Sequence, residues 1–195
     1  AEAHAAIDDM LAGNKLGSAG ARVVIEEFLD GEEASFIVMV DGKNVLPLAS
    51  SQDHKRIFDD DKGPNTGGMG AYSPAPVVTD KLLATVRSKI IEPTLKGMIA
   101  EGKPYAGVLY VGIMATDEGP KVVEYNCRLG DPECQVVLPL YAGDILKLFM
   151  AAEAGKIKEL GAPTAPDGSA AIVVLASKGY PASYQKGFAI TGIDG

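Results

Sequence analysis

The sequence predicts an α+β fold with a mostly antiparallel sheet and flanking helices. Strand-like segments follow one another across short turns, and three further stretches show the apolar periodicity of helices. The chain has 195 residues, of which 47% are apolar and 23% are charged. This composition is ordinary for a globular protein. The length is enough for one domain, or for one domain and part of a second, with a buried hydrophobic core.

The first element expected is an amphipathic helix over residues 3–11, because its apolar residues recur at helical spacing. Strands are expected at 22–29, 33–40 and 45–50, and the Asp-Gly-Lys-Asn turn at 41–44 joins the last two. We expect these three segments to be successive antiparallel strands. One face of the middle strand carries its alternate apolar residues, Ala34, Phe36, Val38 and Val40.

Residues 52–76 show no periodicity and are rich in charge, Gly and Pro, so the sequence predicts a long loop there. Loops of this length are uncommon in compact domains and are often functional. A helix is expected over 79–101, kinked or split by Pro93. Two paired strands are then expected at 106–115 and 120–126.

The last third of the chain should contain a helix over 144–154, because its apolar residues again recur at helical spacing. Asp144 is a favourable N-cap, and Gly155 is a favourable residue at which to end the helix. The Pro, Gly and Asp residues of 156–169 are typical of a linker, and a new strand is expected over 170–176.

Composition and charge exclude several classes of function. The formal net charge is −8 and no basic cluster occurs, which argues against nucleic-acid binding. The most apolar runs, 106–115 and 170–176, are far shorter than the roughly 18 residues needed to span a bilayer. The first residues lack the pattern of a signal peptide. Because the sequence contains only two cysteines and no signal for another compartment, we expect a reduced, cytoplasmic protein.

The segment 121–128 is the first candidate site. Side chains alternate across a strand, so Val122, Glu124 and Asn126 are expected to share one face. A carboxylate and an amide oxygen side by side suit Mg²⁺, and Arg128 offers a planar donor fork for an anion. An alternative stays open, since the same spacing also fits a solvated face of an antiparallel strand.

The long loop is the second candidate site. Residues 52–56 gather titratable and cationic groups, and residues 65–70 form a glycine-rich turn whose N–H groups could approach an anion. A flexible, solvated loop is the alternative. The acids around 25–33 are common at strand ends and by themselves predict no site. With no nearby His, Cys127 and Cys134 are not expected to bind a metal.

Five segments in order resemble the phosphoribosylamine–glycine ligases, also called glycinamide ribonucleotide synthetases, a family of ATP-grasp enzymes of purine synthesis. The segments are IEEFLDGEEASF, SQDHKR, GPNTGGMGAYSPAP, KVVEYNCRLGDPE and ASKGYPASYQKG. Two of them, GPNTGGMGAYSP and NCRLGDPE, are specific to this family among ATP-grasp proteins. The resemblance extends over nearly the whole chain and implies the larger subdomain of an ATP-grasp fold.

The resemblance also implies a reaction in which ATP, glycine and 5-phosphoribosylamine give glycinamide ribonucleotide through a glycyl phosphate. Glu124 and Asn126 would hold Mg²⁺ (or Mn²⁺), and Arg128 would be catalytic by stabilising charge during transfer. The residues expected to contact the nucleotide are Glu26, Glu27, Leu29 and Glu33. Those expected to contact glycine and phosphoribosylamine are Asp53, His54, Lys55, Arg56, Asn65, Thr66, Gly67 and Gly68.

The same resemblance implies an internal fragment. Residues 1–21 would end the small ATP-grasp subdomain, 22–160 would form the larger one, and 166–195 would begin a C-terminal domain. The phosphate loop and phosphate-binding lysine of the family would precede Ala1, so we expect the isolated chain to be inactive and to bind ATP poorly. A nucleotide-binding module without catalysis, another carboxylate–amine ligase of the superfamily, and fusion to other purine-pathway domains stay open.

Overall fold

The computed structural model describes residues 2–12, 17–161 and 168–193. Within them the strands form two sheets, and every strand pair is antiparallel. The larger sheet has the order β2–β1–β5–β6, with β1 (Glu32–Asp41), β2 (Val45–Pro47), β5 (Ala106–Thr116) and β6 (Gly119–Asn126). The smaller sheet has the order β3–β4–β7, with β3 (Gln52–Phe58), β4 (Lys62–Ser73) and β7 (Ala170–Val173).

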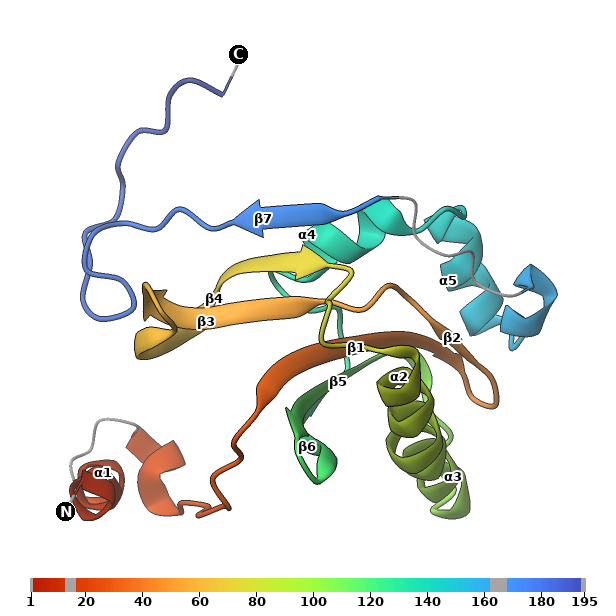
Figure 1. Ribbon diagram of the computed structural model, residues 1–195, viewed down its shortest axis with the longest axis horizontal. Coiled ribbons are helices and arrows are strands. Elements are labelled where there is room, and N and C mark those ends of the chain that lie inside the picture. The colour runs from red at the N-terminus through yellow and green to blue at the C-terminus, as the bar shows by residue number, and fades with distance from the viewer. Residues whose placement is uncertain (1, 13–16, 162–167, 194–195) are drawn as a thin grey trace.

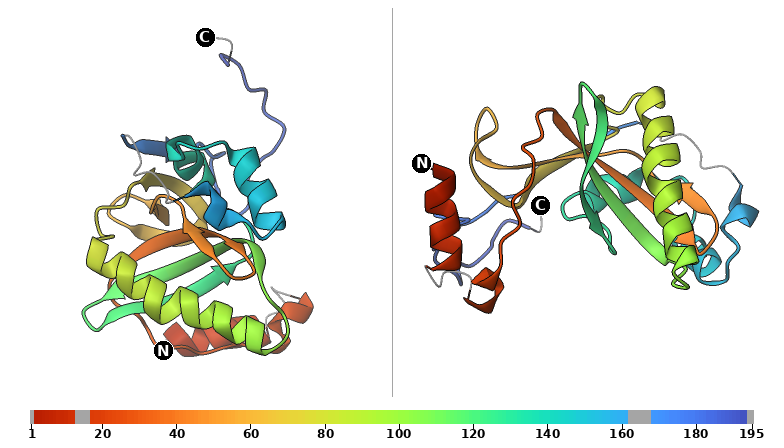
Figure 2. Two further views of the ribbon diagram at one scale, coloured as in Figure 1. Left: turned by 90° about the vertical axis from the view of Figure 1, so that its right-hand side faces the viewer. Right: turned by 90° about the horizontal axis from the view of Figure 1, so that it is seen from below.

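The larger sheet lies between two layers (Figure 1). On one side, α2 (Asp80–Val86), the π-helical turn η2 (Arg87–Ile91) and α3 (Glu92–Ala100) follow one another as a single long helix (Figures 1 and 2). On the other side lie the smaller sheet, α4 (Cys134–Val137) and α5 (Ile145–Glu153). The central strands β1 and β5 are therefore covered on both faces.

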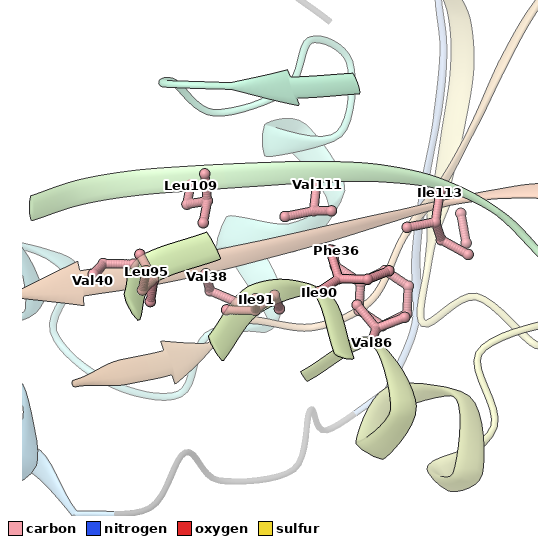
Figure 3. Packing of buried hydrophobic residues seen from close by; sticks show 11 residues of the cluster. Phe36, Val38, Val40, Val86, Ile90, Ile91, Leu95, Leu109, Val111 and Ile113 are labelled. Atoms are coloured by element: carbon pink, nitrogen blue, oxygen red, sulfur yellow. The ribbon is translucent and has the colours of Figure 1, made fainter. Parts of the chain in front are cut away.

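The face of the larger sheet beneath the long helix is an apolar core (Figure 3). Strand β1 contributes the alternate residues that were predicted to share one face, Ala34, Phe36, Val38 and Val40. The helix contributes Val86, Ile90, Ile91 and Leu95, and β5 contributes Leu109, Val111 and Ile113. The apolar residues that alternate along the strands and those at helical spacing along the long helix thus pack together in one cluster.

The opposite face of the same strands is also buried. Ile37 and Tyr110 pack with Ala71 of β4 and with α4, whereas Met39 packs with α5. Ile157, in the short 3₁₀ helix η4 (Ile157–Leu160), completes the second of these clusters. Part of the predicted linker therefore packs against the sheet.

Several elements confirm the predictions together with their local causes. The first helix is α1 (Glu2–Leu11), which the 3₁₀ helix η1 (Gly17–Ala21) follows. Thr79 accepts a hydrogen bond from the N–H of Leu82, and Asp144 accepts from Leu146 and Lys147, so each caps its helix. The disturbance expected at Pro93 takes the form of the π-helical turn η2, which immediately precedes α3.

The strand predicted at 22–29 is wrong. These residues form no strand, and Val24, Ile25 and Phe28 are more than three-quarters exposed. Their apolar and β-branched side chains favour an extended backbone, but no neighbouring strand pairs with them in the described chain. Figure 2 shows the segment leading from η1 to the start of β1 as an extended connection.

The loop predicted at 52–76 is also wrong, because most of it forms the hairpin β3–β4. Register shifts interrupt the pairing twice, between His54 and Arg56 and between Arg56 and Phe58, so the side chains do not alternate regularly. At the tip, Asp60 and Asp61 both have positive φ, the conformation that tight hairpin turns require. Backbone pairing rather than an apolar pattern defines this ribbon.

Four short elements were not predicted, namely the 3₁₀ helices η1 and η4, the helix α4 and the 3₁₀ turn η3 (Leu138–Leu140) that follows α4. The strand expected over 170–176 is confirmed as β7, which pairs with β4. The boundary predicted between residues 160 and 166 falls largely outside the described residues.

Among the described residues, no single helix is long and apolar enough to cross a membrane. Only Cys134–Leu140 and Ile145–Glu153 taken together meet that test, and their axes differ by 98°.

Candidate active site

Polar side chains from both sheets and from the turn after β6 meet in a small pocket of about 60 Å³. We call it the acid pocket. Its lining residues are Asp53, Lys55, Gly67, Tyr110, Glu124, Asn126, Arg128, Gly130, Asp131 and Glu133. Segments far apart in the sequence therefore build one site.

Strand β6 brings Glu124 and Asn126 to this pocket. They pair with Gly112 and Tyr110 of β5, two residues apart on the same side of the sheet, as the sequence predicted. A Cβ on Gly112 would lie 3.1 Å from Cγ of Glu124, so the glycine leaves room for the glutamate over β5.

The prediction that Val122 shares their face is wrong. A register shift pairs Val122 with Ile113 and leaves an additional residue before Glu124. Ile113 belongs to the apolar core beneath the long helix. The resulting bulge therefore places Val122 and Glu124 on opposite sides of the sheet.

Lys55 is the best-anchored cation in the pocket. Its Nζ donates to Oε2 of Glu33 at 2.6 Å and lies 3.3 Å from Oδ2 of Asp53. Burial alone would lower the pKa of Lys55, but the hydrogen bond with Glu33 and the charge of Asp53 outweigh burial and raise it. Burial raises the pKa of Asp53 despite the nearby lysine. Lys55 is therefore a fixed positive charge at neutral pH.

The turn after β6 supplies a buried acid. Glu133 is 3% exposed and accepts a hydrogen bond from Oγ of Ser35 at 3.2 Å. The same Ser35 oxygen lies 2.9 Å from the hydroxyl of Tyr110. Burial, and then the negative charge of Glu133, raise the pKa of Tyr110, so this phenol stays neutral. Arg128 is exposed, and its Nη1 donates to the carbonyl of Leu129.

Gly68 holds the glycine-rich strand β4 against this turn. It has a φ of +123°, and a Cβ there would lie 2.4 Å from Cδ of Pro132 and 3.1 Å from the carbonyl oxygen of Asp131. Only glycine combines this backbone conformation with so close an approach. The two motifs expected to carry function are thus in direct contact.

A second, larger cleft of about 540 Å³ lies beside the acid pocket. We call it the hinge cleft. Its lining includes all four residues expected to contact the nucleotide, Glu26, Glu27, Leu29 and Glu33. Arg56 and Lys121 also line it, and Nζ of Lys121 lies 2.9 Å from Oε1 of Glu27. Glu33 links the two sites, because it lines the hinge cleft and holds Lys55 of the acid pocket.

The residues expected to contact glycine and phosphoribosylamine divide into three groups. Asp53, Lys55 and Gly67 line the acid pocket, whereas Arg56 lines the hinge cleft. His54 is exposed, with its ring against that of Tyr72.

The remaining three of these residues line neither cavity. Thr66 donates to the carbonyl of Lys55 and accepts from the N–H of Gly68, so it supports the strand. Asn65 is exposed, and Gly68 packs on Pro132.

Sequence reasoning missed four of the residues that line the acid pocket, Tyr110, Gly130, Asp131 and Glu133, and missed Lys121 of the hinge cleft. The polar turn that begins at Arg128 was visible, but nothing in it distinguished Glu133 from a surface acid.

The described residues contain no group of three or more His, Cys, Asp or Glu side chains placed to hold a metal ion. Glu124 and Asn126 alone offer one carboxylate and one amide oxygen in the same pocket. This set fits a hard cation that takes its other ligands from phosphates and water, as Mg²⁺ does.

Comparison with known proteins finds a matching family model and similar relatives. Residues 1–134 match the family model described as phosphoribosylglycinamide synthetase, ATP-grasp (A) domain. A phosphoribosylamine–glycine ligase from Vibrio vulnificus strain YJ016 is 59% identical over 193 residues, which are 98% of this chain and 45% of the relative. The chain thus spans less than half the length of that relative.

Solved structures show the same fold. The crystal structure of phosphoribosylamine–glycine ligase from Thermotoga maritima superposes with a TM-score of 0.79 at 36% identity, over 92% of this chain and 44% of that one. The biotin carboxylase domain of the Hydrogenobacter thermophilus 2-oxoglutarate carboxylase, in complex with MgADP, gives a TM-score of 0.50 at 17% identity over 75% of this chain and 30% of that one. The fold is therefore the ATP-grasp fold, and the chain belongs to the phosphoribosylglycinamide synthetase family.

Proposed function

We propose that this chain carries the nucleotide- and metal-binding part of an ATP-dependent ligase that joins glycine to 5-phosphoribosylamine. The observation that supports this most directly is the meeting of Glu124, Asn126 and Arg128 with Asp53 and Lys55 in one pocket beside the hinge cleft. Relatives with this function share more than half of the residues of the chain.

In this proposal the adenine of ATP lies in the hinge cleft, where backbone groups of Glu27 and Leu29 read its edge. The cleft has the volume that a nucleotide base and sugar need. Glu33 stands between the cleft and the acid pocket through its bond to Lys55, so the triphosphate would extend toward Lys55.

Glu124 and Asn126 are the residues that would hold Mg²⁺ (or Mn²⁺). When bound, the ion would offset the negative charge of the ATP phosphates. A biotin carboxylase domain of the same fold is described as a complex with MgADP. The pair by itself provides too few ligands for a closed site, which is consistent with a cation that arrives together with the nucleotide.

The reaction has two steps. A carboxylate oxygen of glycine attacks the γ-phosphorus of ATP and ADP leaves, which gives glycyl phosphate. The amine of phosphoribosylamine then attacks the carbonyl carbon, phosphate leaves, and the amine loses a proton. Negative charge grows on the transferred groups in both steps, and Lys55 and Arg128 are the two cations of the pocket that can stabilise it.

The sequence-based assignments that the geometry leaves open belong to this proposal. Asp53, Lys55 and Gly67 are the substrate contacts that we retain in the acid pocket. We also retain the division into 1–21, 22–160 and 166–195, which the lack of buried residues in α1 supports for the first unit. A cytoplasmic location remains part of the proposal.

The test is ADP release by the full reading frame that contains this chain, measured with glycine and phosphoribosylamine together and with each omitted. We expect release to need both substrates, and Glu124→Gln to reduce turnover at least a hundredfold at limiting Mg²⁺. Glu159→Gln is the matched control, since it removes an equal charge from the exposed end of η4. Nucleotide binding without release of ADP would instead indicate a binding module.

A further inference from the structure

A third cavity, of about 570 Å³, lies at the β2 edge of the larger sheet, between the β1–β2 turn, the long helix and η4. We call it the basic cleft. It shares no lining residue with the acid pocket or the hinge cleft. Strand β6, which carries Glu124 and Asn126, is the edge strand at the opposite end of the strand order. The basic cleft is therefore separate from the site described above.

The charged lining of the basic cleft is mostly positive, although the chain as a whole has a formal net charge of −8. One carboxylate, that of Glu92, faces four cations, namely Lys43, Arg87, Lys96 and Lys158. Glu92 is already paired with Arg87, whose Nε lies 3.2 Å from its Oε1. None of the three lysines takes part in an ion pair of the described residues. The cleft therefore gathers three ammonium groups without a counter-ion in the described part of the chain.

A buried aspartate fixes the frame of the cleft. Asp41 is 9% exposed, and its Oδ1 accepts from the N–H groups of Lys43 and Asn44 at 3.1 and 2.7 Å. Its Oδ2 accepts from the N–H of Ile157 at 3.1 Å. Burial would raise the pKa of Asp41, but its hydrogen bonds outweigh burial and lower it. One carboxylate thus ties the β1–β2 turn to η4, and these two segments present Lys43 and Lys158 to the same cavity.

Apolar side chains line the rest of the basic cleft. Leu46, Leu95 and Ile157 are buried, whereas Ile99 at the opening is 47% exposed. The volume lies within the range of small-molecule sites, about 300–1,000 Å³. Buried apolar residues together with unpaired cations suit an organic molecule that carries an anionic group better than a free, fully hydrated ion.

We propose that the basic cleft is a further ligand site, which binds a phosphate monoester of about nucleotide size. Such a phosphate carries about 1.5–2 negative charges at pH 7, and lysine binds phosphate as a point charge. The phosphate would lie among Lys43, Lys96 and Lys158, and the organic part would cover Leu95 and Ile99. No run of basic residues reveals this site in the sequence, because the cations come from three separate segments. The inference does not rest on the proposed function, in which no residue of the cleft takes part.

The test is calorimetric titration of the full reading frame that contains this chain with AMP, adenosine and inorganic phosphate. Saturating Mg²⁺ and a non-hydrolysable ATP analogue are present throughout, so that the hinge cleft is not available to the probes. We expect wild-type protein to bind AMP at least about tenfold more tightly than adenosine or phosphate, since only AMP offers both parts of the ligand. The affinity for AMP should also fall as salt is raised, because the lysines are exposed.

Variants locate the binding. Lys96→Gln combined with Lys158→Gln should weaken AMP binding at least about tenfold, through the loss of two charge-assisted contacts. Both side chains are exposed and make no ion pair in the described chain, so the variant should keep its fold, which urea denaturation checks. Ile99→Glu, which adds a negative charge at the opening, should have an effect at least as large. Lys147→Gln is the matched control, since this exposed lysine of α5 lines none of the three cavities.

Four results would overturn the inference. The first two are a wild-type protein that binds no AMP at millimolar concentration, and one that binds adenosine as tightly as AMP, which would make the lysines irrelevant. The third is an unchanged affinity for AMP in both cleft variants, which would place the ligand elsewhere. The fourth is phosphate binding as tight as that of AMP, which would reduce the cleft to a site for simple anions. Loss of affinity in the cleft variants but not in Lys147→Gln would support the site, whether or not the protein releases ADP.

Discussion

The two faces of the larger sheet differ in what holds them together. Beneath the long helix, β1 and β5 present only apolar side chains to a cluster that includes Phe36 and Val111. On the opposite face, near the acid pocket, the same strands bury Ser35 and Tyr110 in contact with Glu133. The rest of that face buries apolar clusters of its own, around Ile37 and around Met39, so only the end beside the acid pocket depends on a few defined polar bonds. We call this end the polar face. We expect activity to depend on it, and stability to depend mainly on the apolar clusters.

The largest effect on stability should come from Phe36→Ala. Phe36 is 3% exposed at the centre of the cluster drawn in Figure 3. Its removal should reduce the free energy of unfolding by about 3–5 kcal/mol, through lost burial and the cavity left behind. Urea denaturation of wild type and variant measures the difference.

The folded fraction of this variant should still bind Mg-ATP with unchanged affinity, because Phe36 lines neither the acid pocket nor the hinge cleft. A large loss of affinity at temperatures where the variant is folded would show that the two faces are not separable.

Gly68→Ala should affect both properties. The new Cβ would meet Pro132 at 2.4 Å, so the glycine-rich strand or the turn beyond Arg128 must move. We expect a loss of about 1–3 kcal/mol of stability from overpacking, and a loss of turnover larger than this destabilisation explains. Gly102→Ala is the control, since Gly102 also has positive φ but a Cβ there meets nothing within 4 Å. Equal effects of both substitutions would mean that backbone conformation, and not the contact with Pro132, is responsible.

The difference between the faces also explains what the sequence could predict. The helix face follows from apolar periodicity, which is why β1, β5 and the long helix occur where expected. The hairpin β3–β4 has no such period, because register shifts and glycines replace alternation with backbone pairing. The segment 22–29 has strand-like side chains but no partner strand among the described residues, so composition alone was misleading there.

The candidate site was predictable only where its residues are close in sequence. Glu124, Asn126 and Arg128 lie within five residues on and just beyond one strand, and their placement in one pocket agrees with the prediction. The position of the buried Glu133 carboxylate depends on a hydrogen bond from Ser35, 98 residues away, so no local pattern could identify this residue. The resemblance to a family supplied the segments of the site, and the fold supplied their contacts.

On the polar face, Arg128→Lys should reduce kcat by about tenfold to a hundredfold while the KM for ATP changes less than about twofold. Lysine retains the charge but loses the planar fork that can donate two parallel hydrogen bonds to a phosphoryl or carboxylate group. Steady-state kinetics of the full reading frame that contains this chain would measure both constants. A variant with normal kcat and a raised KM for ATP would make Arg128 a ground-state ligand of the nucleotide instead.

The smallest effect expected is the pH dependence of stability at Asp53, measured as the difference in free energy of unfolding between wild type and Asp53→Asn. Burial raises the pKa of Asp53 above the ordinary carboxyl value of 3.8, more than Lys55 lowers it. The folded state therefore holds this proton more tightly than the unfolded state, so the free energy of unfolding decreases as pH rises from 3.8 through the folded pKa of Asp53.

The contribution of Asp53 to stability should be fully present below pH 3.8 and should be lost as pH rises through its folded pKa. Wild type should thus lose stability relative to Asp53→Asn from pH 3.8 upward until Asp53 is ionised, after which the difference should be constant. Urea denaturation of both proteins at several pH values measures this difference. A difference that grows in favour of wild type with rising pH would show that the ion pair with Lys55 outweighs burial, and that even the polar face is stabilised by its charges.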